Sequence, residues 1–284
     1  MLEGCCMSEK NNKDQRSYLV VQANNFIRHP RTDKLTAMEA NIAYFLMSRV
    51  KPHDKDFMKV TFSVSEFCRV CGIAQFNDSG ENYAGVKNAL KSLADKSAWV
   101  EIRDGKRRGQ RLIRWVDTYE IWDGKGTITA TLSQSIKPYL LELTEHFTQS
   151  ELRNFLAMKS MYSKRLYELL RSYIHSKPES ASRYISEEFE ILDLKKLLNA
   201  ENYGRYADFR VKVLEIAKRE INAVSDMEMD FTPIKPGRIT THVKFTVKLK
   251  NPTDRLHAAA QANAVLDRTT SISSKQINLD EVYQ

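Results

Sequence analysis

The feature that most constrains this chain is a helix followed by a basic hairpin, a unit that occurs twice. In the second copy, apolar side chains recur at helical spacing from Tyr206 to Val224. The strand-like segment Met227–Phe231 follows, then a Pro-Gly turn and the alternating apolar residues of 243–249. The outward side of the predicted helix carries charged residues. This order of elements is typical of a winged helix.

The first copy lies at residues 83–119. Tyr83–Lys96 is predicted to be helical, and the predicted strands Ala98–Arg103 and Gln110–Tyr119 enclose a turn rich in arginine and lysine. A short helix is predicted shortly before the long one in both copies. The repeated order of elements indicates an internal duplication.

We therefore predict an α+β protein of two tandem winged-helix domains related by internal duplication, with flexible polar tails. The predicted parts are a flexible N-terminus at 1–17, an N-terminal winged-helix domain at 18–130, a C-terminal winged-helix domain at 131–250 and a flexible C-terminal tail at 251–284. Within that tail only Ala258–Leu266 has a helical pattern. A further hairpin, with its turn at Asp123-Gly124, is predicted at the end of the first domain.

Composition limits the classes of protein to consider. Of the 284 residues 42% are hydrophobic, and no uncharged run approaches the ~20 residues of a membrane helix. The segment Met1–Cys6 lacks the basic and apolar regions of a secretory signal, so we expect a cytoplasmic protein with no membrane partner. The net charge of +8 and the pI of about 9.2 favour a polyanionic partner.

The sequence lacks the motifs of common enzymes that act on DNA. It has no Gly-x-x-x-x-Gly-Lys-Ser/Thr phosphate loop, no Gly-x-Ser-x-Gly, and no two histidines two residues apart, the spacing found in rolling-circle nicking enzymes. The pair Cys68 and Cys71 has no second Cys or His pair at a spacing suitable for zinc, so two small helical side chains are the simpler interpretation. We therefore predict that the protein is not an enzyme and has no catalytic residues, metal or cofactor.

Candidate DNA-binding residues gather on the second copy. On an exposed helix, arginine can pair with guanine, aspartate can accept from cytosine and valine can contact a thymine methyl. The candidates on this helix are Arg205, Asp208, Arg210, Val211, Lys212 and Arg219. The hairpin after it has no acidic residue in 235–250 and supplies Lys235, Arg238 and Lys244. The alternative is an ordinary surface helix with a solvated charged face.

The first copy and one helix start add candidates for phosphate contacts. The first copy supplies Lys87, Lys91, Arg107, Arg108 and Arg111. For its hairpin, a charged turn that protects an edge strand is the alternative. A predicted helix start, where free backbone N–H groups can bind phosphate, adds Ser163, Lys164 and Arg165. Simple helix capping explains this last group equally well.

Three stretches of the second half follow one another in order: Lys137–Leu143 with Phe147-Thr148, Lys159–Leu170, and Asp208–Asn222 with Lys235–Arg238. Together they resemble the initiator proteins of iteron-controlled plasmids, the replication initiator (Rep) family. The resemblance in element order covers about residues 18–250. It implies two winged-helix domains that bind short direct repeats, called iterons, in double-stranded DNA at a plasmid origin. In the family, the C-terminal domain reads most of the sequence.

The resemblance also has implications for assembly. Such proteins bind the repeats as monomers, deform and help melt adjacent A·T-rich DNA, and so start replication. As dimers in exchange with monomers, they repress their own gene through an inverted repeat. Dimer contacts are implied for the N-terminal domain, and host initiator, replicative helicase and chaperones are implied partners. A dimeric winged-helix transcription regulator without a replication role is the alternative, and an origin-nicking nuclease ranks third.

Overall fold

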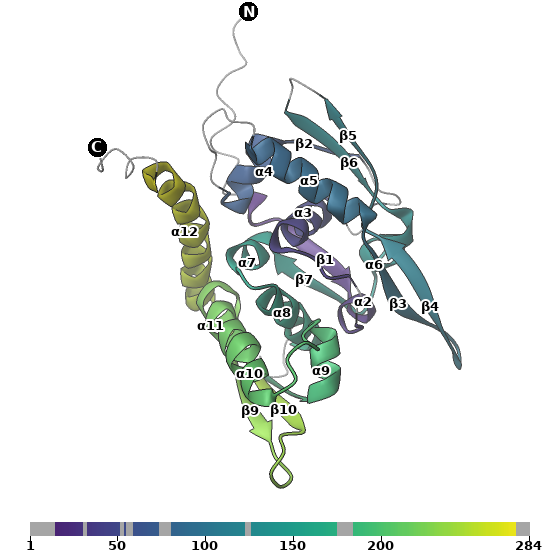
Figure 1. Ribbon diagram of the computed structural model, residues 1–284, viewed down its shortest axis with the longest axis vertical. Helices are drawn as coiled ribbons and strands as arrows, with labels where there is room; N and C mark the ends of the chain where they lie inside the picture. The colour runs from purple at the N-terminus through teal and green to yellow at the C-terminus, as the bar shows by residue number, and fades with distance from the viewer. Residues whose placement is uncertain are drawn as a thin grey trace, which may run out of the picture.

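The structure is a computed structural model, and it consists of two sets of elements that follow one another in the same order (Figure 1). It describes residues 15–30, 33–51, 54, 59–73, 81–122, 126–174 and 184–276. The first set comprises β1 (Leu19–Ala23), α2 (Asn24–Ile27), α3 (Ala37–Met47), β2 (Val60–Ser63), α4 (Val64–Cys71), α5 (Glu81–Asp95), β3 (Ser97–Asp104) and β4 (Arg107–Arg114).

The second set repeats this order. It comprises β7 (Phe147–Glu151), α7 (Leu152–Ala157), α8 (Met161–Ile174), β8 (Tyr184–Glu190), α9 (Ile191–Leu197), one long helix built from α10 (Tyr206–Phe209), η2 (Arg210–Leu214) and α11 (Glu215–Val224), then β9 (Met227–Ile234) and β10 (His242–Leu249). Each set has the helices and the hairpin of a winged helix. The predicted duplication is therefore confirmed.

The two sets differ in how the hairpin joins the sheet. In the second set β8 pairs with β10, so the hairpin is part of a three-stranded sheet in the order β8-β10-β9. In the first set β2 pairs instead with β6 (Thr127–Leu132), which also pairs with β5 (Val116–Trp122). The β3–β4 hairpin is thus a separate two-stranded sheet, and in Figure 1 it projects from the body. The turn expected at Asp123-Gly124 lies outside the described residues.

The first strands of the two sets pair with each other. Strand β1 runs antiparallel to β7, and the register is symmetric about the pair Val21 and Gln149, which hold the same position in each set. The second set therefore begins at β7, after the short helices η1 (Gln134–Ile136) and α6 (Lys137–Leu140). This start differs from the boundary at residues 130–131 that the sequence suggested, because β5, β6, η1 and α6 have no counterpart in the second set.

Helix ends follow the local sequence signals. The Thr36 hydroxyl accepts from the backbone N–H of Glu39, whose carboxylate accepts from the backbone N–H of Thr36, so α3 starts with a reciprocal capping box. Ser63 caps α4 by accepting from the backbone N–H of Glu66. At the end of α4, Gly72 adopts φ 67°, a left-handed conformation that favours glycine. Both ends of α4 therefore follow from residues next to the helix in the sequence.

One hydrophobic core extends through both sets. Within the first set, Phe45 packs edge-on against Phe62 and Phe67, with ring centroids 5.1 and 5.3 Å apart. Between the sets, Tyr44 of α3 stacks on Phe155 of α7 at 4.2 Å. Aromatic pairs at such distances stabilise a fold beyond their buried area. The two domains therefore share a packed interface and form one body.

The C-terminal segment differs from the flexible tail that was expected. Helix α12 (Pro252–Gln276) packs on α7, α11 and α4, and thus contacts both sets. Its side chains Ala258, Ala262 and Leu266 are buried. A Cβ added to Gly72 would lie 2.6 Å from the Leu266 carbonyl oxygen, so the backbones approach closely there. This buried side of α12 is weakly marked in the sequence, because two of its three residues are alanines, which contribute little hydropathy.

The N-terminal tail also differs from expectation where it is described. Arg16 is buried, donates to the carbonyl oxygens of Arg69 and Val70 at 2.8 and 2.9 Å, and forms an ion pair of 2.8 Å with Asp267 of α12. Residues 1–14 and 277–284 lie outside the described residues. Within the described part of the chain, none of the helices has the length and apolarity needed to cross a membrane.

Candidate nucleic-acid interface

The long helix of the second set, residues 206–224, is here called the recognition helix. One side of it is in the core, where Phe209, Val213, Leu214, Ala217 and Ile221 are fully buried. The opposite side is exposed and carries the predicted candidates Arg205, Arg210, Val211, Lys212 and Arg219, together with Glu215. Val211 is 53% exposed. An exposed side with cationic and apolar groups can contact both phosphates and base edges.

The centre of the recognition helix is a π-turn rather than regular α-helix. The segment η2 places one extra residue in the turn, so Arg210, Val211 and Lys212 are exposed in succession while Val213 and Leu214 are both buried. Turns of this kind cost regular hydrogen bonds and occur often at functional sites. The π-turn therefore directs three consecutive side chains away from the core.

An ion pair precedes this turn at the start of the helix. The Arg205 guanidinium donates from Nε to one Asp208 carboxylate oxygen at 2.9 Å and from Nη2 to the other at 3.2 Å. The hydrogen bond from Arg205 lowers the pKa of Asp208, and Lys212 adds to that effect, so Asp208 is ionised at neutral pH. Arg205 and Asp208 thus hold a donor and an acceptor at the same end of the helix. In the major groove guanine presents acceptors and cytosine a donor, so a guanine–cytosine base pair presents the matching groups.

The basic surface of the β9–β10 hairpin is concentrated at its turn. Lys235 and Arg238 are exposed there. On the sheet, Lys244 is exposed but lies opposite Glu188 of β8 in the strand register. Strand β8 thus places an acidic residue beside β10, which has none of its own, and β9 adds Glu228 and Asp230. The end of the hairpin is also less basic than expected, because Lys250 is buried, where it donates to the Asn222 carbonyl oxygen at 2.5 Å and its pKa is lowered by burial.

The hairpin turn also contains an exposed apolar residue that the sequence reading did not single out. Ile239 follows Arg238 and is 74% exposed. The signal available in the sequence was an isoleucine between polar turn residues.

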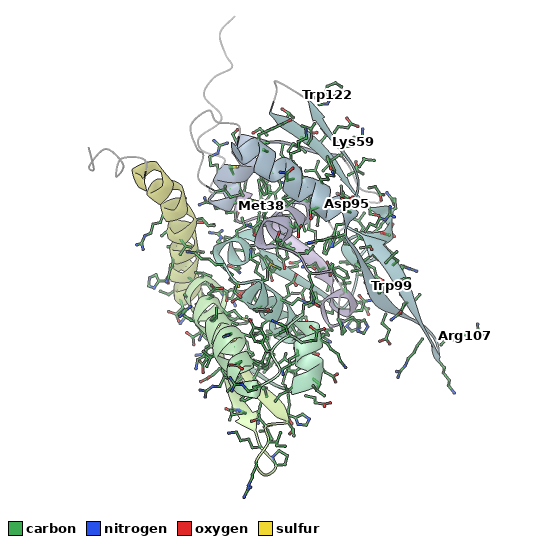
Figure 2. The ribbon with its side chains drawn as sticks, viewed as in Figure 1. Met38, Lys59, Asp95, Trp99, Arg107 and Trp122 are labelled. Atoms are coloured by element: carbon green, nitrogen blue, oxygen red, sulfur yellow. The ribbon has the colours of Figure 1, made fainter. Side chains whose placement is uncertain are left out.

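The first set presents a second basic surface. Lys87 and Lys91 are exposed on α5. Arg107, Arg108 and Arg111 are exposed on β4, and Figure 2 shows Arg107 at the outer end of the β3–β4 hairpin. No other element of the described structure covers this end. The arginines predicted as phosphate contacts are therefore accessible to the phosphates of a DNA duplex.

The three candidates at the start of α8 are wrong as DNA contacts because they are buried between the domains. Ser163 and Lys164 are at most 1% exposed, and Arg165 is 6% exposed. Arg165 donates to the carbonyl oxygens of Ile27, His29 and Leu197 and to the Glu168 carboxylate, at 2.7 to 3.2 Å. The Arg165 side chain therefore holds the second set against the first.

Lys164 makes its own contact across the interdomain interface. Its ammonium group donates to the Asn41 side chain of α3. Burial lowers its pKa to about 8, and the nearby acidic groups, among them Glu220 and Glu168, only partly offset this effect. Lys164 and Arg165 are thus structural cations. The sequence predicted a helix start here but could not show that the other domain covers that start.

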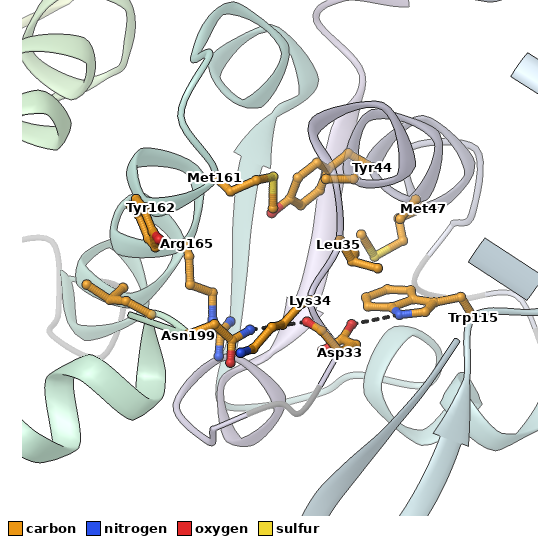
Figure 3. Close-up of a pocket in the computed structure, with 13 residues that line it drawn as sticks. Asp33, Lys34, Leu35, Tyr44, Met47, Trp115, Met161, Tyr162, Arg165 and Asn199 are labelled. Carbon is orange, nitrogen blue, oxygen red and sulfur yellow. Dashed lines mark hydrogen bonds between the residues drawn. The ribbon is translucent and has the colours of Figure 1, made fainter. Parts of the chain in front are cut away.

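A cavity of about 190 Å³ lies in the same interface (Figure 3). Side chains of both sets line it, among them Tyr44 and Met47 of α3 and Met161 of α8. At its polar end the Trp115 indole donates to the Asp33 carboxylate at 2.8 Å, and Asn199 donates to the Asp33 carbonyl oxygen at 3.1 Å. The second of these hydrogen bonds joins the first set to the loop after α9. The cavity therefore marks a place where the two domains are held together.

The described residues contain no group of three or more His, Cys, Asp or Glu placed to hold a metal ion. Cys68 and Cys71 are both free and buried in α4. Burial raises the pKa of the Cys68 thiol to about 11 and raises that of Cys71 further. They are small core side chains, as the simpler interpretation had it.

Two winged-helix units, each with an exposed basic hairpin, define a tandem winged-helix DNA-binding protein. Residues 19–171 match the family model described as "Initiator Replication protein, WH1", and residues 190–247 match "Initiator Rep protein, WH2". The chain belongs to this family of replication initiator (Rep) proteins, which confirms the resemblance found in the sequence. The match to the WH1 family model extends through β7 and most of α8, well beyond residue 130.

A solved structure supports the same fold. The chain is similar to the protein in the crystal structure of Pi initiator protein in complex with iteron DNA, with a TM-score of 0.65 and 16% identity over 83% of this chain and 99% of that chain. The crystal structure of the MSBI1.176 WH1 domain, a replication protein isolated from a multiple sclerosis patient, matches 37% of this chain and 77% of that chain at 19% identity. Its TM-score of 0.28 is too low to support a structural argument.

Proposed function

We propose that this replication initiator binds iterons, repeated double-stranded DNA sites at a plasmid origin, and promotes melting of adjacent A·T-rich DNA. The observation that carries the proposal is the exposed side of the recognition helix, where the π-turn presents Arg210, Val211 and Lys212 together. A helix of this size fits the major groove, which is about 12 Å wide. The Pi initiator protein, whose fold is similar, was crystallised with iteron DNA.

Each basic surface has a role in this proposal. The recognition helix reads base edges in the major groove, with Arg205, Asp208 and Arg210 as the sequence-specific groups. The turn residues Lys235 and Arg238 contact flanking phosphates, and Arg219 and Lys244 are more distant phosphate contacts. On the first set, the groups that add affinity without sequence preference are Lys87, Lys91, Arg107, Arg108 and Arg111.

We further propose a homodimer, in exchange with the monomer, that represses its own gene through an inverted repeat. The first set supplies the dimer contact in this proposal. Trp99 and Leu112 support it, because they face each other across the β3–β4 hairpin and are 47% and 43% exposed. Apolar side chains exposed together mark interaction surfaces. Host initiator, replicative helicase and chaperones complete the set of proposed partners, and a cytoplasmic location fits all of them.

The proposal is tested by letting the full chain select duplexes from a randomised library and then comparing selected sites in tandem and inverted arrangements. An initiator binds tandem sites as a monomer, and permanganate then modifies thymines in an A·T-rich segment placed beside them on supercoiled DNA. Binding to inverted sites only, without permanganate reactivity, supports the alternative of a dimeric transcription regulator. A nick or covalent adduct on the supercoiled DNA contradicts the prediction that the protein is not an enzyme.

A further inference from the structure

Ile239, in the turn between β9 and β10, is the most exposed large apolar side chain among the described residues, at 74%. A single exposed isoleucine is ordinary on a protein surface. This one differs in its surroundings, because Arg238 precedes it and Lys235 stands four residues before it, both exposed. A DNA duplex has stacked, largely apolar bases between two rows of phosphates. An apolar side chain flanked by cations can contact both parts at once.

The turn holds Ile239 in a defined place. The backbone N–H of Thr241 donates to the Ile234 carbonyl oxygen at 3.1 Å, which closes the base of the turn. The backbone N–H of Ile191 donates to the Thr241 carbonyl oxygen at 3.0 Å and so ties the turn to α9. Gly237 adopts φ 98°, in the region that favours glycine, so the chain reverses without strain. The isoleucine therefore projects from an anchored loop.

The same turn lies beside the start of the recognition helix. Arg238 and Ile239 of the turn line the same groove of about 530 Å³ as Gly204 and Tyr206 at the start of the helix. A duplex bound at the start of the recognition helix would therefore lie close to this turn. In B-form DNA the groove next to the major groove is the minor groove, and the wing turn is the element placed to enter it.

We propose that Ile239 is a wedge that enters the minor groove and partly unstacks one base step, while Lys235 and Arg238 contact the phosphates on either side. The inference rests on the proposed DNA-binding function and adds how binding would deform the DNA. Apolar wedges of this kind, isoleucine included, kink a duplex towards its major groove. Pyrimidine–purine steps such as TA unstack most readily, so we expect the wedge at such a step.

The test uses the full chain and a duplex that it has selected from a randomised library. The ends carry a fluorophore pair that reports the bend, and 2-aminopurine, whose fluorescence rises on unstacking, replaces adenine at successive positions. Ile239→Ala removes the wedge, Ile239→Met keeps an apolar one, and Leu256→Ala is a matched control because Leu256 is 71% exposed on α12. Both positions of change are exposed, so equal thermal unfolding midpoints will verify that the three variants fold.

We expect the wild-type chain to raise 2-aminopurine fluorescence at one step beside the recognition-helix site. Ile239→Ala should abolish that signal and reduce the bend by at least about 20°, the lower end of wedge-induced kinks. Its affinity should fall by less than about tenfold, because the phosphate contacts that dominate affinity remain. Ile239→Met and Leu256→Ala should behave like wild type.

The outcomes separate this inference from the proposed function. If the wild-type chain selects no duplex, the proposed function fails and the wedge fails with it. If the chain selects and binds a duplex but Ile239→Ala leaves both the bend and the unstacking signal unchanged, the wedge alone is wrong. Loss of both signals in Leu256→Ala as well would also overturn it, because the effect would then not depend on the wing.

Discussion

Arg165 offers the sharpest test of how the two domains are joined. Its guanidinium donates to the carbonyl oxygens of Ile27 and His29 in the first set, at 2.7 and 2.8 Å, and to that of Leu197 in the second set, at 3.0 Å. It also forms an ion pair of 3.2 Å with Glu168, whose side chain is 1% exposed. Replacing Arg165 with alanine leaves these acceptors buried with fewer donors and removes the ion-pair partner of the Glu168 carboxylate, which keeps the Gln22 amide as a donor.

The loss of stability expected from Arg165→Ala follows from the burial of the Arg165–Glu168 ion pair. Removing one partner of a buried ion pair costs about 3–5 kcal/mol, because the remaining charge stays in the low-dielectric interior. That is a large part of the ~5–15 kcal/mol by which a typical protein is stable. We therefore expect Arg165→Ala to lower the free energy of unfolding by about 3–5 kcal/mol. Adding Glu168→Gln should restore part of the loss, since a neutral amide is less costly to bury.

The assay is urea unfolding followed by circular dichroism, with Arg108→Ala as the control. Arg108 is an exposed arginine on β4, so its replacement should change stability by less than about 0.5 kcal/mol. The reasoning is refuted if Arg165→Ala unfolds at the wild-type urea concentration and instead weakens DNA binding with a shallower salt dependence. Arg165 would then face DNA, as a helix start in the sequence first suggested.

Three further predictions concern basic side chains. Arg210→Ala should cost about 1–3 kcal/mol on a selected duplex and relax base preference at one position, measured by fluorescence anisotropy; wild-type binding would remove this residue as a reader. Replacing both Arg107 and Arg108 with alanine should lower the log–log salt slope of binding by about one unit per lost phosphate contact, and an unchanged slope would mean a merely solvated hairpin. For Lys164, the unfolded chain binds a proton that the folded chain has released between pH 8 and the ordinary lysine pKa of 10.5, so stability should rise through that window. At about 1.4 kcal/mol per pKa unit, the free energy of unfolding should rise by about 3 kcal/mol. Urea midpoints at pH 7.5 and 10 should show this rise for wild type and not for Lys164→Met. Parallel changes in both proteins would contradict the prediction.

Local patterns predicted the elements well, for a physical reason. A capping box such as that of Thr36 and Glu39 joins groups three residues apart, so the sequence window contains the whole interaction. The same holds for the buried stripe of the recognition helix and for Gly72 at the end of α4. The order of these elements also revealed the duplication and the family.

Interactions between distant segments were not accessible in this way. The pairing of β8 with β10 places Glu188 opposite Lys244, although residues 235–250 contain no acidic residue. The π-turn was missed because its apolar residues Val213 and Leu214 are adjacent and fit a regular helix almost as well. The helical pattern at Ala258–Leu266 lies within α12, but the full length of this helix and its packing on α7, α11 and α4 depend on the surface it covers.

The sequence by itself determined the type and order of the elements, the exposed charged side of the recognition helix and the family, because these depend on spacing along the chain. Only the tertiary structure decided which charges are accessible. Lys164 and Lys212 are both lysines on helices with mixed surroundings in sequence, yet one is buried against Asn41 and the other is exposed. The difference is set by the domain that packs on α8, and a charge becomes a DNA contact or a structural cation according to what covers it.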